Sequence, residues 1–150
     1  MYSGKVALLV LFHVFLFFSL DWHHNLTDAQ TIARREHKYI LLNFSGSDWC
    51  GPCIRMKKEI FESDAFMKMA DSELVLVNAD FPRDKKNQPT KEQQQINDAM
   101  ADKYNPLGKF PFTLLLDENG KVMGTWEGLP KETPELFIED IHNDIYTAGK

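Results

Sequence analysis

Two closely spaced cysteines are the residues of this sequence best suited to chemistry. Cys50 and Cys53 are the only cysteines among the 150 residues, and Gly51 and Pro52 separate them. A Cys-x-x-Cys pair between a strand and a helix is typical of redox sites, because unpaired N–H groups at a helix N-terminus favour the thiolate that attacks disulfides. The alternatives are half of a zinc site and an inert buried pair, although zinc needs four ligands and no second cysteine pair exists.

The segments on either side of this pair predict the elements that would position it. The apolar run at 39–44 is typical of a buried central strand. A helix is expected from Cys50 to about Phe61, with Pro52 in its first turn, where a missing N–H costs nothing. The first sulfur would therefore lie at the N-terminus of the helix.

The rest of the chain alternates between helical and strand patterns. Helices are expected at about 28–37, 91–104 and 133–146, a helical turn at 63–69, and strands at 21–24, 74–79, 112–116 and 121–126. In the helix at 91–104, the apolar spacing places Ile96, Ala99 and Met100 toward the core. The Asp-Glu-Asn-Gly sequence at 117–120 predicts a hairpin turn. This order predicts an α/β fold with parallel crossovers followed by an antiparallel hairpin.

Residues 1–20 differ from the remainder of the chain. A short positively charged start, ending at Lys5, precedes a nearly unbroken apolar run at 6–20. This layout predicts a cleaved export signal, since a helix of that length spans only about 22 Å of a hydrocarbon core of about 30 Å. A retained inner-membrane anchor and a buried core helix are the alternatives. Lys5 predicts that the remainder of the chain, expected to be a single domain at 21–150, lies outside the cytoplasm.

Composition narrows the class of protein further. Apolar residues make up 43% of the chain, which supports a packed core, and the net charge is −5. The sequence has no basic stripe of the kind that would indicate nucleic acid as a partner. We expect the protein to be a monomer. Exported small domains often carry several structural disulfides, but a single disulfide between Cys50 and Cys53 would close too small a loop to stabilise the fold. The pair is therefore expected to serve chemistry.

Over about 22–146 the sequence resembles the thioredoxin superfamily. The likeness rests on Trp49-Cys50-Gly51-Pro52-Cys53 after a buried strand, on Pro111 before a later strand, and on Gly128 after the last strand. Segments 43–50 and 80–83 resemble, more narrowly, exported thioredoxin-like proteins of Bacteroidetes-type Gram-negative bacteria. The resemblance implies a three-layer α/β/α thioredoxin fold, with a central mixed sheet of four to five strands and a C-terminal antiparallel hairpin.

The same resemblance implies roles for individual residues. Cys50 would be the attacking nucleophile, Cys53 the buried resolving thiol, and Pro111 a cis-proline facing the two sulfurs. No metal and no cofactor other than the Cys50–Cys53 disulfide is implied. The residues expected to bind the substrate chain are Trp49, Gly51, Pro52, Phe110, Pro111 and Gly128.

The implied activity is that of a thiol–disulfide oxidoreductase that reduces or isomerises disulfides of exported proteins. The Gly-Pro pair between the cysteines is the one found in reducing thioredoxins, so an exported reductant would need a membrane electron donor as partner. The protein would touch the membrane itself only if its N-terminal segment is retained. The alternatives are a module that binds or holds proteins without turnover and a membrane-tethered factor for cytochrome maturation.

Two departures from the family pattern bear on Cys53. Thioredoxins usually have a buried Asp six residues before the first Cys, where this chain has Phe44, and its Lys partner would fall at Leu76. Water or the leaving Cys50 thiolate would then accept the proton of Cys53, which predicts slow resolution. Asp48 is expected to cap the helix or tune the site, and the charges at 83–86 are expected to be a solvated loop.

Overall fold

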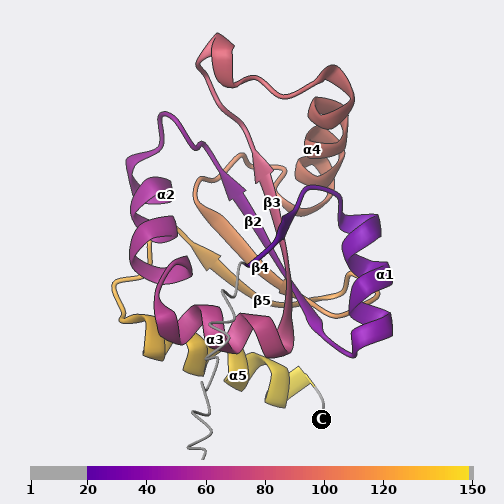
Figure 1. Cartoon of the computed structure of the whole chain (residues 1–150), viewed down its shortest axis with the longest axis vertical. Coiled ribbons are helices and arrows are strands. Elements are labelled where there is room, and N and C mark those ends of the chain that lie inside the picture. Colours follow the sequence, from indigo (N-terminus) through magenta and orange to yellow (C-terminus); the bar gives the residue numbers. More distant parts are fainter. Residues whose placement is uncertain (1–19, 149–150) are drawn as a thin grey trace, which may run out of the picture.

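A five-stranded mixed sheet forms the middle layer of the protein (Figure 1). The computed structural model describes residues 20–148. The strands are β1 (Trp22–His23), β2 (Tyr39–Ser45), β3 (Leu74–Asp80), β4 (Phe112–Leu116) and β5 (Val122–Glu127), in the spatial order β1-β3-β2-β4-β5. β3 is parallel to β1 and β2, whereas β4 is antiparallel to both β2 and β5. Antiparallel pairing therefore begins at β4, beside the centre of the sheet, and is not confined to an edge.

Helices cover both faces of the sheet and complete the expected three-layer architecture (Figure 1). One face carries α1 (Leu26–Glu36) and α4 (Lys91–Tyr104), and the other carries α2 (Gly51–Met56), α3 (Asp64–Glu73) and α5 (Pro134–Ala148). A π-helical turn (Lys57–Phe61) joins α2 to α3, and a short 3₁₀-helix (Lys85–Asn87) precedes α4.

Alternation along β2 divides the core into two clusters. Ile40, Leu42 and Phe44 pack toward α1 and α4, while Leu41 packs with Met56 and the helices of the opposite face. Six of the seven residues of β2 are buried, which explains its continuous apolar pattern. Successive side chains of a strand point to opposite faces of the sheet, and both faces are covered by helices. Each side chain of β2 therefore packs in one of the two clusters.

Side-chain caps explain where several helices begin. Asn25 accepts a hydrogen bond from Thr27 N, so α1 begins before the expected position. Ser63 accepts from Phe66 N and opens a ten-residue helix where only a turn was expected. The expected core face of α4 was partly wrong, since Asn97 is buried and Ala99 is exposed.

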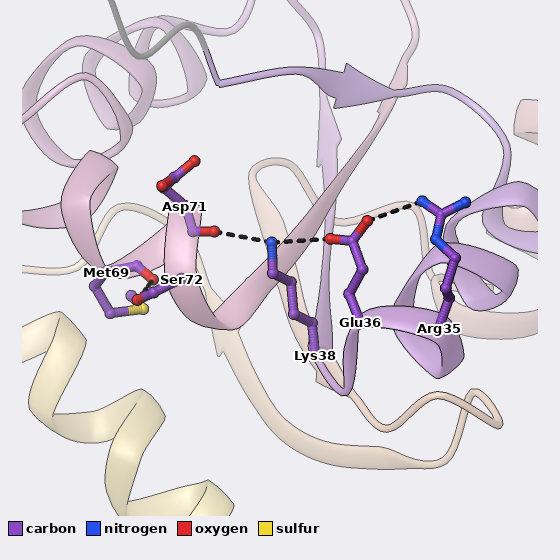
Figure 2. Close-up of polar contacts among 6 residues, drawn as sticks. All are labelled: Arg35, Glu36, Lys38, Met69, Asp71 and Ser72. Atoms are coloured by element: carbon purple, nitrogen blue, oxygen red, sulfur yellow. Dashed lines mark hydrogen bonds and ion pairs between the residues drawn. The ribbon is translucent and has the colours of Figure 1, made fainter. Parts of the chain in front are cut away.

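Charged contacts gather at the amino end of β2, away from the cysteines (Figure 2). Lys38 Nζ donates to Asp71 O over 2.8 Å and lies 3.1 Å from Glu36 Oε2, which ties the end of α3 to the turn before β2. Hydrogen bonds from Arg35 and Lys38 lower the pKa of Glu36. Exposed pairs of this kind add little stability, so the two buried clusters hold the fold.

The predicted export signal or anchor at 1–20 lies, except for Leu20, outside the described residues. Leu20 is partly buried and packs against the cluster on the α2, α3 and α5 face. Within residues 20–148, no helix has the length and apolar character needed to cross a membrane. The prediction for the N-terminal segment therefore stays a prediction.

Candidate functional site

Cys50 and Cys53 form a disulfide just beyond the carboxyl end of β2. Cys50 is the N-cap of α2, and Cys53 N donates to Cys50 Sγ over 3.3 Å. A backbone N–H aimed at the sulfur favours its charged form once the disulfide is reduced. The structure confirms the expected place of the first sulfur at a helix start, and both cysteines are buried, with relative exposures of 4% and 5%.

Gly51 and Pro52 occupy the first turn of α2, as the sequence predicted for Pro52. Both residues are exposed beside the buried disulfide. An incoming chain would therefore meet this turn next to the sulfurs. Their role in binding substrate stays a prediction.

Trp49 is fixed from three sides. Its Nε1 donates to Phe81 O over 2.8 Å, and its ring meets the Phe110 ring edge-on at 5.5 Å between centroids. Gly46 lies so close beneath the indole that an added β-carbon would collide with the ring. The glycine is therefore needed for a close approach and not for its backbone conformation.

The peptide bond between Phe110 and Pro111 is cis, as the resemblance to the thioredoxin superfamily implied. Gly128 N donates to Pro111 O over 2.9 Å, and Gly128 has a φ of 77°, which favours glycine. Through these contacts the structure joins Trp49, Phe110, Pro111 and Gly128. These are four of the six residues that the sequence assigned to substrate binding.

Two carboxylates clamp the loop after β2 and the loop after β3 onto each other. Asp80 accepts hydrogen bonds from Ser47 N over 2.9 Å and from Ser47 Oγ over 2.5 Å. In the other direction, Asp48 accepts from Arg83 N and Asp84 N, each over 2.9 Å. The loop that carries Trp49 is therefore held by the loop after β3.

The expected capping role of Asp48 is wrong, because Cys50 is the N-cap and Asp48 faces the other loop. Asn87 Nδ2 also donates to Asp48, over 3.0 Å. Hydrogen bonds from the backbone of Arg83 and from Asn87 lower the pKa of Asp48. Asp48 therefore stays charged, and keeps accepting these bonds, to a lower pH than an unperturbed Asp carboxylate would.

Sequence reasoning missed Arg83. The charges at 83–86 are exposed, as expected of a solvated loop, but the Arg83 guanidinium carbon also lies 3.7 Å from the centroid of the Trp49 ring. The two residues are far apart in the chain, and nothing in their spacing signals the contact. Only the clamp between the two loops brings them together.

A cluster of amides and hydroxyls lies on the α2 face of the sheet, on the side of Cys53, and its Ser45 Oγ also lies 3.3 Å from Asp80 Oδ1. Asn43 Nδ2 donates to Asn78 Oδ1 over 3.0 Å, and Thr113 Oγ1 donates to Asn43 Oδ1 over 3.0 Å. Ser45 Oγ donates to Asn78 Oδ1 over 3.1 Å. Since Thr113 also contacts Met56 Sδ at 3.8 Å, the cluster reaches α2.

The expectation that Phe44 takes the place of a proton acceptor behind Cys53 is wrong. Phe44 is fully buried in the opposite cluster, among residues of α1 and α4. Its neighbour Asn43 lines a pocket together with Cys53. The polar side chain that β2 directs toward the cysteines is therefore an amide. Leu76, the other expected departure, is buried on the same face as Asn43.

The pocket behind Cys53 has a volume of roughly 360 Å³. Trp22 and Phe61, whose rings lie 5.1 Å apart, provide apolar lining, while the polar lining comes from His24, Asn43, Ser45, Ser47, Lys57 and Asn78. A pocket of this size with several polar partners can admit water to the neighbourhood of Cys53. Water is thus a suitable proton acceptor for that thiol.

Comparison with known proteins places this site in a family. The family model described as a thioredoxin-like domain matches residues 26–140. Disulfide bond reductase DsbH of Chlamydia pneumoniae is 37% identical over 103 residues, which cover 69% of this chain and 60% of DsbH. Thioredoxin-related protein DsbJ of the same organism is 32% identical over 99 residues, which cover 65% of this chain and 27% of DsbJ.

A solved structure described as DsbH oxidoreductase superposes with a TM-score of 0.77, at 30% identity and over 85% of both chains. The two full-length Chlamydia relatives are longer, and the match covers less than two thirds of the length of either one. These relatives do not confirm the narrower resemblance to Bacteroidetes-type proteins. The matched domain covers most of the chain, from α1 into α5, and the thioredoxin fold and its Cys-x-x-Cys disulfide agree with it. The chain belongs to the thioredoxin-like family.

Proposed function

We propose that this protein is a thiol–disulfide oxidoreductase that reduces or isomerises protein disulfides through Cys50 and Cys53. The observation that carries the proposal is the disulfide between Cys50 and Cys53 at the start of α2, with Cys53 N directed at Cys50 Sγ. The rim of Trp49 and Phe110 beside it supports binding of an extended chain. The match to a disulfide bond reductase supports the reducing direction.

The proposed reaction begins with the reduced dithiol. Cys50 thiolate attacks one sulfur of the substrate disulfide, forms a mixed disulfide and releases the other substrate sulfur as a thiolate. Cys53, after losing its proton to water, attacks Cys50 Sγ and releases the second substrate thiolate. The substrate gains two electrons, and the protein ends in the disulfide form that the structure holds. Trp49, Gly51, Pro52, Phe110, Pro111 and Gly128 would hold the substrate chain during both steps.

We further propose that the protein works outside the cytoplasm, in the periplasm. The apolar run at 6–20 after Lys5 supports export or anchoring in the inner membrane. A reductant in that compartment must be recharged with electrons from across the membrane. A membrane electron donor that reduces the Cys50–Cys53 disulfide is therefore the expected partner, and the dithiol itself needs no further cofactor.

Reduction of insulin tests the activity. Wild-type protein supplied with a chemical reductant should accelerate the reaction, and Cys50→Ser should abolish the acceleration because the attacking sulfur is gone. Cys53→Ala should instead accumulate mixed disulfides with substrates, which can be identified after trapping. An unchanged rate in Cys50→Ser would contradict the proposal and favour a holding module. Recovery of haem-protein precursors alone would favour cytochrome maturation.

The redox potential tests the direction. Equilibration with glutathione should give a reduction potential of about −270 mV for the Cys50–Cys53 disulfide, the value of reducing thioredoxins with the same Gly-Pro pair. A value above about −180 mV would mark an oxidant and contradict the reductant assignment.

A further inference from the structure

The Arg83 guanidinium lies on the ring of Trp49, the residue that precedes Cys50. The guanidinium carbon is 3.7 Å from the ring centroid. The ring itself is held by Phe81 O, Phe110 and the close approach of Gly46. The cation therefore stands on a fixed surface at the rim of the disulfide site.

The backbone beneath Arg83 is also fixed. Asp48 accepts hydrogen bonds from Arg83 N and Asp84 N, each over 2.9 Å, and from Asn87 Nδ2 over 3.0 Å. Because Asp48 immediately precedes Trp49, the clamp and the stacked ring belong to the same short loop. Little freedom has to be lost when the guanidinium engages a partner, which favours binding.

The charges around Arg83 leave its donors available. Within residues 20–148, no hydrogen bond or ion pair of the structure uses the Arg83 side chain, which is exposed. Of the charges close to Arg83 in the chain, Asp84 pairs with Lys86 at 3.4 Å, and the Asp48 carboxylate is occupied by Arg83 N, Asp84 N and Asn87 Nδ2. A guanidinium carries five N–H donors in a planar fork that fits a carboxylate.

We propose that Arg83 is a specificity-determining residue that binds a carboxylate of the substrate chain. It selects protein disulfides that carry an Asp or Glu within a few residues of the attacked cystine. The inference rests on the proposed function, because it assigns the substrate preference of the same site. Its basis is a stacked, exposed and unpaired guanidinium beside the residue that leads into Cys50.

Matched peptides provide the test. Two cyclic cystine peptides differ only in Glu or Gln beside the cystine, and kcat/KM for their reduction is measured with wild type, Arg83→Met, Arg83→Lys and Lys85→Met. Wild type should prefer the Glu peptide by about fivefold, the size expected of a well-oriented exposed pair, and the preference should shrink with added salt. Arg83→Met should bring the ratio to about one, through a larger fall in kcat/KM for the Glu peptide than for the Gln peptide.

Two further variants separate the effect of the guanidinium from that of charge in general. Arg83→Lys keeps the charge but not the fork, so part of the preference should be lost. Lys85→Met removes an exposed cation from the same loop and should keep the full preference. A preference that survives in Arg83→Met overturns the proposal. An equal fall for both peptides also overturns it, because Arg83 would then act only by supporting Trp49.

Binding without turnover distinguishes this inference from the proposed function. The oxidised wild-type protein is titrated with analogues in which both peptide cysteines are replaced by serine, and the indole N–H signal of Trp49 is followed by NMR. Tighter binding of the Glu analogue to wild type, with no such preference in Arg83→Met, would support the inference whether or not the peptides are reduced. Failure to reduce any peptide would contradict only the reductase assignment. Equal affinity for the Glu and Gln analogues overturns the inference even if both peptides are reduced.

Discussion

The two sulfurs of the disulfide have different surroundings. The loop leading into Cys50 carries the Trp49 ring, which meets Phe110 and the Arg83 cation at the surface. The polar side chains that the sheet places beside Cys53 are buried or half-buried amides and hydroxyls, and Asn43 lies at their centre. The rim offers ring faces and a cation to a partner chain. The interior satisfies its polar atoms with hydrogen bonds and places no charge on β2 behind Cys53.

This difference shows how a buried thiol can lose its proton without a charged neighbour on the strand. A lone buried carboxylate would be costly, whereas amides that hydrogen-bond each other are not. Within the described residues, no buried side-chain nitrogen or oxygen atom lacks a hydrogen-bond partner. The pocket beside Asn43 then gives water access to Cys53.

The largest expected effect on stability comes from placing a charge on the face of β2 that packs against α1 and α4. Phe44→Asp would bury a carboxylate among the apolar side chains that face α1 and α4. The loss of the ring and the unpaired charge together should cost at least about 4 kcal/mol of unfolding free energy, measured by denaturant titration. Phe44→Leu, the matched control, should cost about 1 kcal/mol. A stable Phe44→Asp protein with faster mixed-disulfide release would reverse the assignment of the two faces.

A smaller effect is expected from disturbing the rim. Gly46→Ala would push a methyl group into the indole of Trp49 and displace the ring from Phe81 O and Arg83. Insulin reduction should fall roughly tenfold or more, because a misplacement of about 1 Å near the reacting atoms can cost up to about a hundredfold. The NMR signal of the Trp49 indole N–H should shift as well. Full activity with an unmoved indole signal would show that the rim tolerates the methyl group and does not depend on Gly46.

The sequence predicted much of the fold because its strongest patterns are local. The buried run of β2, the α4 boundaries and the Cys50 helix start all follow from short-range periodicity and caps. The cis bond at Pro111 was predicted from family resemblance alone. Asn97 was missed because an amide with a hydrogen bond to Asp80 O can occupy a core position.

The site was harder to predict because its contacts join distant segments. Counting back from Cys50 selected Phe44, but a strand reverses its side chains at every residue, so a one-residue difference in loop length selects the opposite layer. Arg83 reaches Trp49 only through the Asp48 clamp. Neither the length of a loop nor a contact between two loops has a periodic signature in the sequence.

The buried surroundings of Cys53 can be tested by changing one amide, that of Asn43, to a carboxyl group. Asn43→Asp would place a carboxyl group beside Cys53, where burial should raise its pKa. Once ionised, that group can take the proton of Cys53 in place of water. Release of substrate from the mixed disulfide should become several-fold faster than in wild type above the pKa of the new group. Stopped-flow measurement of that release from about pH 5 to pH 9 tests this.

Stability provides the matching control. A raised folded-state pKa means that the Asn43→Asp protein is most stable below the unfolded pKa of about 3.9 and loses stability as pH rises through the folded value. Asn97→Asp makes the same change at a buried amide on α4, so it should reproduce a stability loss at high pH but leave release from the mixed disulfide unchanged. Equal release rates in wild type and Asn43→Asp at every pH would show that water in the pocket already removes the proton fast enough. Proton loss from Cys53 would then not limit resolution, and the absence of a carboxylate on β2 beside Cys53 would carry no kinetic cost.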